Sequence, residues 1–533
     1  MKFEKYVKVN TRDLRLAIHE AMHPMCEWYD WNHDGLPYFA NVVTQEGFGN
    51  FHHTSWSAGH CAPRWMESMY RALKVGEKWE PSIYQNLKKW VYRVYDNGIG
   101  LPANIDTETF ELKKESDICN LRESFYGLAC IYLCEKDPRA LEIAGQVIRT
   151  VDAYLDRAAG EWNDEKYFRE RGAHAVGLFT GDWEKPRFCN TFGRFIGGLT
   201  VLYQATGLPQ ALRLALEIAN IALHTVVKPD GSFDPNETAP HVYSTSSMLS
   251  AIAFLAAVTQ DHQLYDRLDA FMKNGYYQVA LNCGWVCENV GRTVLNGEIN
   301  DSCDLLEVCL ELGKAGYEGY FARAEKMMRG HILPSQLLDT HFISDAPDAD
   351  ASKDHMASRV KGAFGFPCPY GHEYEPGSLI SFNWDIVGGV SGLCRAYETA
   401  VTRLDSGIVS VNLLFDYEDD GIKVTSPYGC GDTLGLCVKE SVPVRVRLPQ
   451  NVDTDKVRAA GAGLGVEHAI LGEWLYLTNP VPGQWLRIAM PMVEKVEKCR
   501  FLGHDLAFKW RGEEIVAASS QGKRLCFFPE MDP

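Results

Sequence analysis

The feature that most constrains the fold of this chain is a regular succession of helical segments. Apolar residues recur at three- and four-residue spacing in twelve segments between residues 12 and 400. The clearest of them carries Ala211, Leu214, Ala215, Ile218, Ile221 and Ala222. The spacing predicts helices over 12–28, 62–75, 82–97, 121–135, 138–158, 190–206, 209–227, 242–258, 263–280, 302–314, 318–331 and 383–400.

Short and long connections alternate between these helices. Only a few residues join the helices at 135–138, 207–209 and 260–262, and such short joints make antiparallel hairpins. Long loops separate the hairpins, over 29–61, 98–120, 159–189, 228–241, 281–301 and 332–382. Six successive hairpins predict a mainly α fold, a closed (α/α)6 barrel with inner and outer rings. An open helical solenoid is the alternative, but no repeat of fixed length is visible.

Beyond about residue 404 the pattern changes to that of strands. Apolar and polar residues alternate over 407–414, 421–425, 433–438, 442–448 and 485–490. The sequence therefore predicts a barrel domain over 1–404 and a C-terminal β-sandwich domain over 405–533. Two last segments, near 501–510 and 514–528, are expected to complete the sandwich.

Composition excludes several classes of protein. The net charge of −17 argues against nucleic-acid binding, which needs a basic face. The N-terminus has no apolar signal segment and no run of eighteen apolar residues offers a membrane span, so we expect no membrane partner. Sixteen scattered cysteines without a CxxC pair favour reduced thiols and a cytoplasmic location. Homo-oligomerisation is left open.

A ring of helices with long loops at one end forms a cup, where ligands bind. Inner helices should begin at that end, so residues near their first turns are the candidates. The first loop and the helix that follows it supply a dense group of ring and hydrogen-bonding side chains: His52, His53, Trp56, His60, Arg64 and Trp65. In a cup such rings typically stack on sugars, although ordinary packing is the alternative.

Polar residues recur at the starts of later inner helices. Arg122 and Glu123 open one helix, Arg194 another and His241 a third, while Trp384 and Asp385 precede the last. Each of these residues alone is weak evidence for a binding site, because ion pairs on a helix are commonly solvated and a lone His is often a cap. Two arginines facing one cup would also suit a substrate carboxylate.

The loop over 281–307 concentrates acids and thiols: Glu288, Glu298, Asp301, Asp304, Cys283, Cys287 and Cys303. Such groups perform proton transfer, nucleophilic attack or metal binding. A helix cap with buried thiols is the alternative. Glycoside hydrolysis needs two carboxyl groups about the scissile bond. Any two of Glu288, Glu298, Asp301 and Asp385 are candidates for that pair.

In these residues the chain resembles glycoside hydrolase family 127, the β-L-arabinofuranosidases and their relatives. Asp301-Ser302-Cys303 looks like the family's Glu-x-Cys element, and His241 and Glu325 are similar to substrate-contacting residues. Scattered motifs carry the resemblance over about residues 50 to 492. It implies a six-hairpin barrel with C-terminal sandwich modules, a general acid near Glu288, a zinc site and a nucleophilic cysteine.

One departure from this family bears on the chemistry. The family's Cys-Cys-Pro-Pro-Asn motif is missing, and residues 366–369 or 381–385 take its place. The nucleophilic thiolate thus lacks a clear counterpart, so we expect no cofactor and a carboxylate mechanism. Asp301, Cys303 and Cys368 remain the possible zinc ligands.

The sequence thus predicts a glycoside hydrolase that removes a terminal sugar by carboxylate acid/base catalysis. Glu288 is the expected general acid, and Asp301 the nucleophile or the base that activates water. The residues expected to hold the sugar are His53, Trp56, His60, Arg122, Glu123, Arg194, His241, Glu325, Trp384 and Asp385. The alternatives are a uronidase, an unsaturated-uronide hydrolase or a polysaccharide lyase on the same barrel, and a non-catalytic carbohydrate-binding protein.

Overall fold

The structure is a computed structural model. It describes residues 3–6, 9–43, 49–175, 192–233, 241–290, 297–341, 343–344, 351–365, 380–383, 385–429, 431–461, 464–519 and 531–532.

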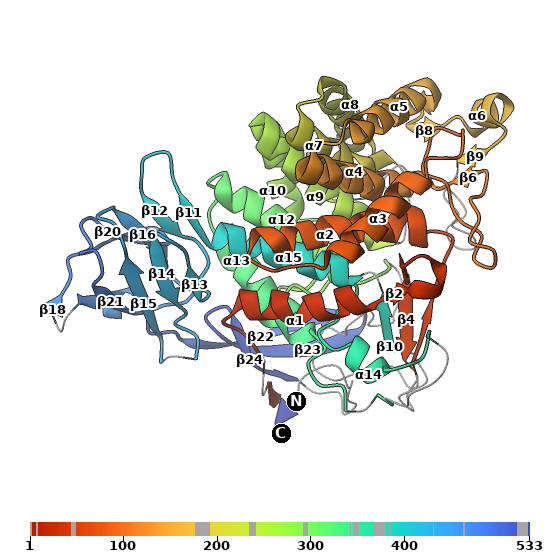
Figure 1. The fold of residues 1–533 in the computed structure, drawn as a ribbon. Coiled ribbons are helices and arrows are strands. Elements are labelled where there is room, and N and C mark those ends of the chain that lie inside the picture. Colours follow the sequence, from red (N-terminus) through yellow and green to blue (C-terminus); the bar gives the residue numbers. More distant parts are fainter. Residues whose placement is uncertain are drawn as a thin grey trace.

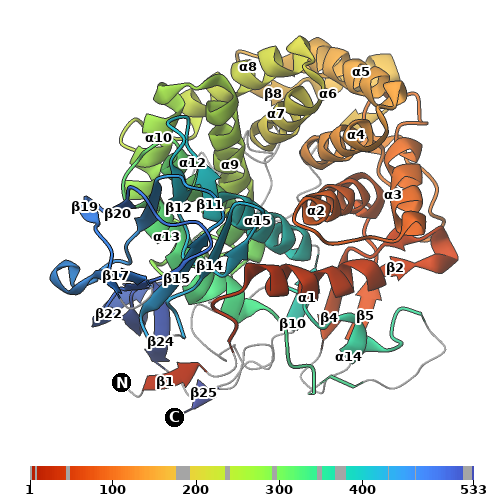
Figure 2. The ribbon, with the colours of Figure 1, turned by 60° about the vertical axis from the view of Figure 1, so that its left-hand side comes forward.

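Six helices form a closed inner ring, seen from one end in Figure 2. They are α2 (Ala62–Lys74), α4 (Leu121–Glu135), α7 (Arg194–Thr206), α9 (Val242–Thr259), α12 (Ile299–Lys314) and α15 (Asp385–Ala400). Each packs on the next in this order, and α15 returns to α2. Most residues of these helices are buried. In α9 all residues from Val242 to Ala256 are buried, as a fully enclosed helix requires.

The outer ring consists of α1 (Leu14–Glu27), α3 (Pro81–Arg93), α5 (Pro138–Tyr154), α8 (Pro209–Thr225), α10 (His262–Lys273) and α13 (Tyr320–Met327). The first helix of the chain, α1, packs on α15 and α2 and so completes the last hairpin (Figure 2). The predicted (α/α)6 barrel is confirmed, and the solenoid is excluded because the ring is closed.

The short joints within the hairpins follow from their sequences. Inner helices end on residues in the left-handed region, Lys136, Gly207 and Gln260, with φ of 56°, 71° and 55°. The outer helices then start on Pro138, on Pro209 or after the capping carboxylate of Asp261.

The length and composition of α9 are those of a membrane-spanning helix, although the sequence pattern did not predict a membrane span. Its mean hydropathy is 1.5 over eighteen residues, yet 83% of that window is buried inside the protein. The helix is apolar because it belongs to the inner ring.

Two sheets follow α15 and lie beside the end of the barrel where that helix ends (Figure 1). One has the order β11 (Val401–Arg403), β12 (Val409–Val411), β16 (Val444–Arg447), β20 (Trp474–Leu477), β19 (Ala469–Leu471). The other has the order β13 (Tyr417–Glu418), β14 (Ile422–Thr425), β15 (Thr433–Val438), β21 (Trp485–Ala489), β17 (Arg458–Gly461), β18 (Leu464–Gly465). They share one apolar core, to which Val411, Leu436 and Leu475 belong, as in a β-sandwich.

The last strands differ from the expectation that they complete this sandwich. A third sheet has the order β22 (Glu494–Phe501), β23 (His504–Arg511), β24 (Glu514–Ser519), β1 (Phe3–Tyr6), β25 (Met531–Asp532). Phe508, Trp510 and Ile515 on this sheet belong to the apolar core of the barrel. The N-terminal strand supplies a partner that lies at the other end of the chain, which the local strand pattern cannot reveal.

A small sheet lies near the start of α15. It consists of β4 (Ala40–Val43) between β5 (Gly49–His52) and β10 (Ile380–Asn383). The sheet ties the first loop of the chain to the segment that enters the last inner helix.

Candidate active site

The inner helices α4, α7, α9 and α12 begin at the same end of the barrel, which we call the barrel mouth. Side chains in their first turns contact one another directly. Arg122 of α4 donates hydrogen bonds to Tyr243 of α9 and, at 3.3 Å, to Asp304 of α12. Arg194, the first residue of α7, donates to Glu123 of α4 at 2.8 Å.

Glu123 is the centre of a buried ion-pair network. One of its oxygens, Oε1, accepts from Arg122 at 3.1 Å and from Arg194 at 2.8 Å. All three side chains are buried. Burial alone would raise the pKa of Glu123, but Arg194, His60 and Arg122 outweigh it and lower the pKa to about 2. Glu123 is therefore ionised and balances the two arginines.

His60 enters the mouth from a π-helical turn, Ser57–Cys61, that precedes α2. Its Nδ1 lies 2.8 Å from Asn120 Oδ1 and 3.7 Å from Glu123 Oε2. Burial lowers its pKa to about 4, so the imidazole is neutral at neutral pH. The Trp56 ring lies 6.1 Å from that of His60 and is half-buried.

Four carboxyl groups surround the start of α12. Asp301 is fully buried and Asp304 nearly so, and the hydroxyl of Ser246 on α9 lies 3.1 Å from an oxygen of each. The pKa of Asp301 is raised well above its ordinary value by burial and then by Glu298, Asp304 and Asp385. Burial also raises the pKa of Asp304, to about 7, against the opposing effect of Arg122. The surroundings of Asp301 therefore favour its protonated form.

The other two carboxyl groups are held around Asn300. Its main-chain N–H donates to Asp385 at 2.9 Å, and its side-chain amide donates to Glu298 at 3.3 Å. The second oxygen of Glu298 lies 3.1 Å from Nε2 of His241, the residue before α9. His241 is partly exposed, with 20% of its side chain accessible, whereas Glu298 and Asp385 are buried.

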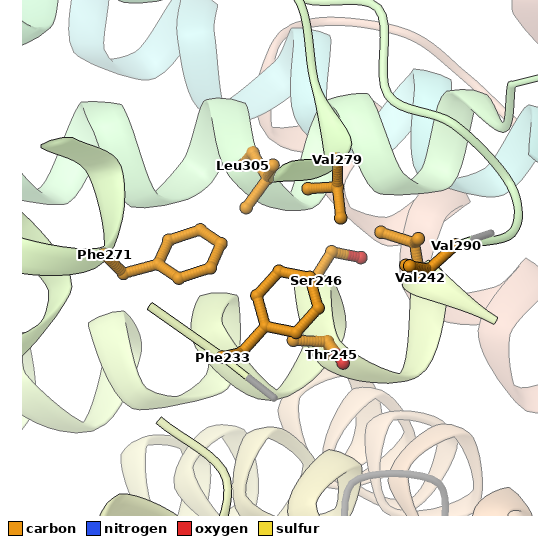
Figure 3. A pocket seen from close by; sticks show the side chains of 8 residues that line it. All are labelled: Phe233, Val242, Thr245, Ser246, Phe271, Val279, Val290 and Leu305. Carbon is orange, nitrogen blue, oxygen red and sulfur yellow. The ribbon is translucent and has the colours of Figure 1, made fainter. Parts of the chain in front are cut away.

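Apolar packing lies behind Ser246, as Figure 3 shows. Phe233, Val242, Phe271, Val279 and Leu305 point toward one another around a cavity of about 10 Å³, which Ser246 also lines. The lining is almost entirely apolar, so a water molecule there would find few hydrogen-bond partners. This apolar packing contributes to the burial that raises the pKa values of Asp301 and Asp304.

Most of the predicted residues meet at the barrel mouth: His60, Arg122, Glu123, Arg194, His241, Asp301 and Asp385. Trp56 borders this group through its ring contact with His60. Glu288 lies on the preceding loop, half-buried, and its main-chain oxygen accepts from Val242 N at 2.9 Å. Trp384 and Cys368 lie outside the described residues.

His53 belongs to a different cavity. Its Nε2 lies 3.2 Å from Asp30, and its ring stacks on Tyr38 with centroids 4.6 Å apart. With His33 and His52 these side chains line a cavity of about 310 Å³ beside the small β4 sheet. Among the contacts of the described residues, none links His53 to the carboxyl groups around α12.

Glu325 does not lie at the mouth, which corrects its expected role in binding the sugar. It is fully buried on the outer helix α13, where it pairs with Arg329 at 2.9 Å and with Arg447 of β16 at 2.7 Å. Its carboxylate also accepts from the main-chain N–H of Leu414. These partners occupy both oxygens and join the barrel to the two-sheet unit.

The thiol of Cys303 does not join the carboxyl groups in a metal site. Adding a Cβ at Gly392 of α15 would bring it 2.9 Å from Cys303 Sγ, so the thiol packs closely against that glycine. Burial raises the pKa of the thiol well above its ordinary value. In the part of the chain that the structure describes, no three His, Cys, Asp or Glu side chains are placed to hold a metal ion. Cys368, the third of the possible zinc ligands, lies outside the described residues.

The sequence interpretation did not include two residues of the barrel mouth, Tyr243 and Ser246. Tyr243 accepts from Arg122, and its ring lies 4.5 Å from the Arg194 guanidinium. Ser246 lies one turn further along α9, beside Asp301. The signal was present in the polar run at 243–247, which is unusual at the start of an otherwise apolar helix.

Neither a protein-family model nor a curated protein matches the sequence. Among solved structures, a glycoside hydrolase family 127 β-arabinofuranosidase matches with TM-score 0.58 and 14% identity, covering 96% of this chain and 85% of that one. A family 127 β-L-arabinofuranosidase from Geobacillus stearothermophilus T6 matches with TM-score 0.54 and 14% identity over 94% and 80% of the two chains. A protein described as a glycoside hydrolase matches with TM-score 0.53 and 13% identity over 90% and 83%. At such identities the likeness establishes a common fold, and the predicted resemblance to family 127 is confirmed at that level.

Proposed function

We propose that the protein is a glycoside hydrolase that removes a terminal sugar from an oligosaccharide or glycoside. The observation that carries this proposal is the group of four carboxyl side chains at the barrel mouth, within which burial raises the pKa of Asp301. Glycoside hydrolysis needs one carboxylic acid to protonate the leaving oxygen and one carboxylate to attack or to activate water. The printed descriptions of the similar structures, two β-arabinofuranosidases and a glycoside hydrolase, support the same class.

Asp301 is the general acid in this proposal, which revises its expected role as nucleophile or base. Burial and three neighbouring carboxyl groups raise its pKa, which favours the protonated form that a general acid needs. Glu298 is the proposed second carboxyl group of the pair. The Asn300 amide donates to one of its oxygens, and Nε2 of His241 lies 3.1 Å from the other.

A neutral sugar fits the mouth better than a uronate. The two arginines that would bind a substrate carboxylate already share Glu123, and Arg122 also contacts Asp304. A uronate would have to compete with these internal partners. The half-buried Trp56 ring and the partly exposed His241 are suited to stack on and hydrogen-bond to a neutral sugar.

The experiment is a panel of aryl furanosides, pyranosides and glucuronides, followed by kinetics of Asp301→Asn on the best substrate. We expect turnover of a neutral glycoside, and a loss of about 100-fold or more in kcat/KM for the variant. Glu311→Gln, on the same helix but paired with Lys314 at its far end, is the matched control and should retain activity. Binding without turnover across the panel would favour the non-catalytic alternative, and turnover of glucuronides alone would favour the uronide enzymes.

The carboxylate roles need their own comparison. Glu298→Gln should reduce kcat strongly, whereas Glu288→Gln should have a smaller effect. The reverse order would return Glu288 to the catalytic pair.

The reaction in this proposal is carried by carboxyl groups and uses no metal. Dialysis of the enzyme against a chelator should leave kcat/KM unchanged. A loss of activity that zinc restores would overturn this part of the proposal.

A further inference from the structure

A second cavity opens at the opposite end of the barrel, where the inner helices end. It measures about 330 Å³, and its lining includes Arg71, Lys74, Tyr126, Gln204, Arg395 and Glu398 from α2, α4, α7 and α15. The volume is that of a small-molecule binding site. None of these residues belongs to the group of four carboxyl side chains at the barrel mouth.

The lining of this cavity carries both cations and carboxylates. Arg71, Lys74 and Arg395 supply three cations, against the carboxylates of Glu67 and Glu398. Glu67 is already occupied: it accepts from Arg64 at 2.6 Å, from Ser391 at 3.2 Å and from Arg71. Glu398 is exposed and has no ion pair among the described residues.

The cations retain unused hydrogen-bond donors. Arg71 contacts Glu67 through Nε, and Nε of Arg395 lies 2.7 Å from Glu307. The Lys74 ammonium lies 5.7 Å from the centre of the Tyr70 ring. Within the described part of the chain, the terminal nitrogens of both arginines and that ammonium have no hydrogen-bond acceptor. A guanidinium with both terminal nitrogens available is suited to bidentate binding of carboxylate or phosphate.

Cations near helix C-termini commonly serve only to balance the helix dipole. Arg71 and Lys74 do lie in the last turn of α2. Neither donates to a main-chain carbonyl among the described residues, however, so they are not used as caps. Burial and the nearby charge of Arg71 lower the pKa of Arg395, against the opposing effect of the Glu307 carboxylate. A bound anion would supply a further acceptor for both guanidinium groups.

We propose that this rear cavity binds a small anion through its carboxylate or phosphate group. Arg71, Arg395 and Lys74 donate to the anion, and the Tyr70 ring borders it. The site is separated from the mouth by a stack along the barrel, in which the Tyr126 ring lies 5.2 Å from the Arg64 guanidinium and 5.1 Å from that of Arg122. The anion therefore does not compete with a substrate at the mouth.

The test is isothermal titration calorimetry of the full chain with inorganic phosphate and, separately, with malonate, at constant ionic strength. We expect one saturable site, with the tighter of the two anions identifying the preferred group. Lys74→Met removes an exposed donor, and Ala205→Phe fills the cavity from α7 without altering a charge. Each should weaken binding by about tenfold or more, the first by loss of a charge-assisted hydrogen bond and the second by steric exclusion of the anion.

Lys498→Met removes an exposed lysine on β22 and serves as the control, which should bind the anion as the unmodified protein does. Circular dichroism of each variant establishes that it is folded. The proposal is overturned if neither anion binds the unmodified protein. It is equally overturned if both cavity variants bind as the control does.

Discussion

Ser246 on α9 donates to Asp301 on α12 across the interface of two neighbouring inner helices, with 3.1 Å between hydroxyl and carboxyl oxygen. The same hydroxyl lies 3.1 Å from Asp304. A hydroxyl donor favours the ionised form of a carboxyl group, whereas burial and neighbouring carboxylates favour the protonated form. The second effect prevails at both aspartates, whose pKa values are raised. Ser246 therefore limits how far these values rise.

Replacing Ser246 by Ala should move the pH profile of the enzyme. Loss of the donor raises the pKa of the aspartate pair, so Asp301 stays protonated to higher pH. We expect the basic limb of the kcat/KM profile to move upward by roughly half a unit to one unit, since a net hydrogen bond is worth about 1 kcal/mol. Ser247→Ala on the same helix, which loses only a bond to the Ser244 carbonyl, should leave the limb in place. A basic limb that stays fixed or moves downward in Ser246→Ala would argue against Asp301 as the acid.

The raised pKa values also predict how stability depends on pH. Asp304 has a folded-state pKa of about 7, above its ordinary value of 3.8, so the folded protein binds more protons than the unfolded chain in that window. Its contribution is fully present below 3.8 and is lost as pH rises through about 7. The free energy of unfolding, measured with urea, should fall as the pH rises from 4.5 to 8. This fall should be smaller in Asp301→Asn, because the variant removes one carboxyl group of the pair.

Glu123 acts in the opposite direction and at lower pH. Its pKa is lowered from 4.5 to about 2, so its contribution is present above 4.5 and is lost as pH falls through about 2. Acid unfolding of Glu123→Gln should therefore begin from a lower stability and depend less on pH below 4.5. Equal pH dependence in the variant and the unmodified protein would contradict the ion-pair network.

Gly388 on α15 fixes how closely this helix approaches the carboxyl groups. A Cβ at this position would lie 1.9 Å from Asn300 Oδ1 and 3.1 Å from Asn300 Cα. Gly388→Ala must displace Asn300, which holds both Asp385 and Glu298. We expect kcat/KM to fall by about tenfold or more. Gly145→Ala on the outer helix α5, whose nearest neighbour would be an Arg149 nitrogen at 3.4 Å, should keep full activity and test for a general effect of the substitution.

The sequence was informative where structure follows from local pattern. Apolar spacing located the helices, and the joints at Lys136, Gly207 and Gln260 identified the hairpins because they leave no room for any other connection. Once inner helices were assigned, their first turns pointed to Arg122, Arg194 and Asp301 without any knowledge of contacts. Helix direction alone brings such residues to one end of a closed ring.

Properties that depend on distant partners were not accessible in this way. Nothing local to Asp301 indicates that Glu298 and Asp385 raise its pKa, because the effect depends on the spacing of three chain segments. The pairing of β1 with β24 is equally invisible to a strand pattern. A short motif placed Glu325 beside the substrate, whereas its partner Arg447 comes from a different domain of the chain.

The Glu325–Arg447 ion pair should therefore contribute to stability rather than to substrate binding. Removing one member of a buried pair leaves the other charged and unpaired, at a cost of roughly 3–5 kcal/mol. Arg447→Met should cost more than Glu325→Gln, because Arg447 also pairs with Glu513 at 3.0 Å, so its loss removes an ion-pair partner from two carboxylates. The amide of Glu325→Gln still accepts from Leu414 or Arg329 and so retains part of the network.

Urea unfolding of both variants measures this difference directly, and kinetics below the unfolding transition measure KM for the folded fraction. We expect the free energy of unfolding to fall more in Arg447→Met than in Glu325→Gln, while KM stays unchanged in both variants. Lys326→Gln, the neighbouring residue on α13, controls for substitution on this helix and should affect stability far less, because its ammonium is not in an ion pair among the described residues. A rise in KM for Glu325→Gln without a loss of stability would return Glu325 to the substrate site.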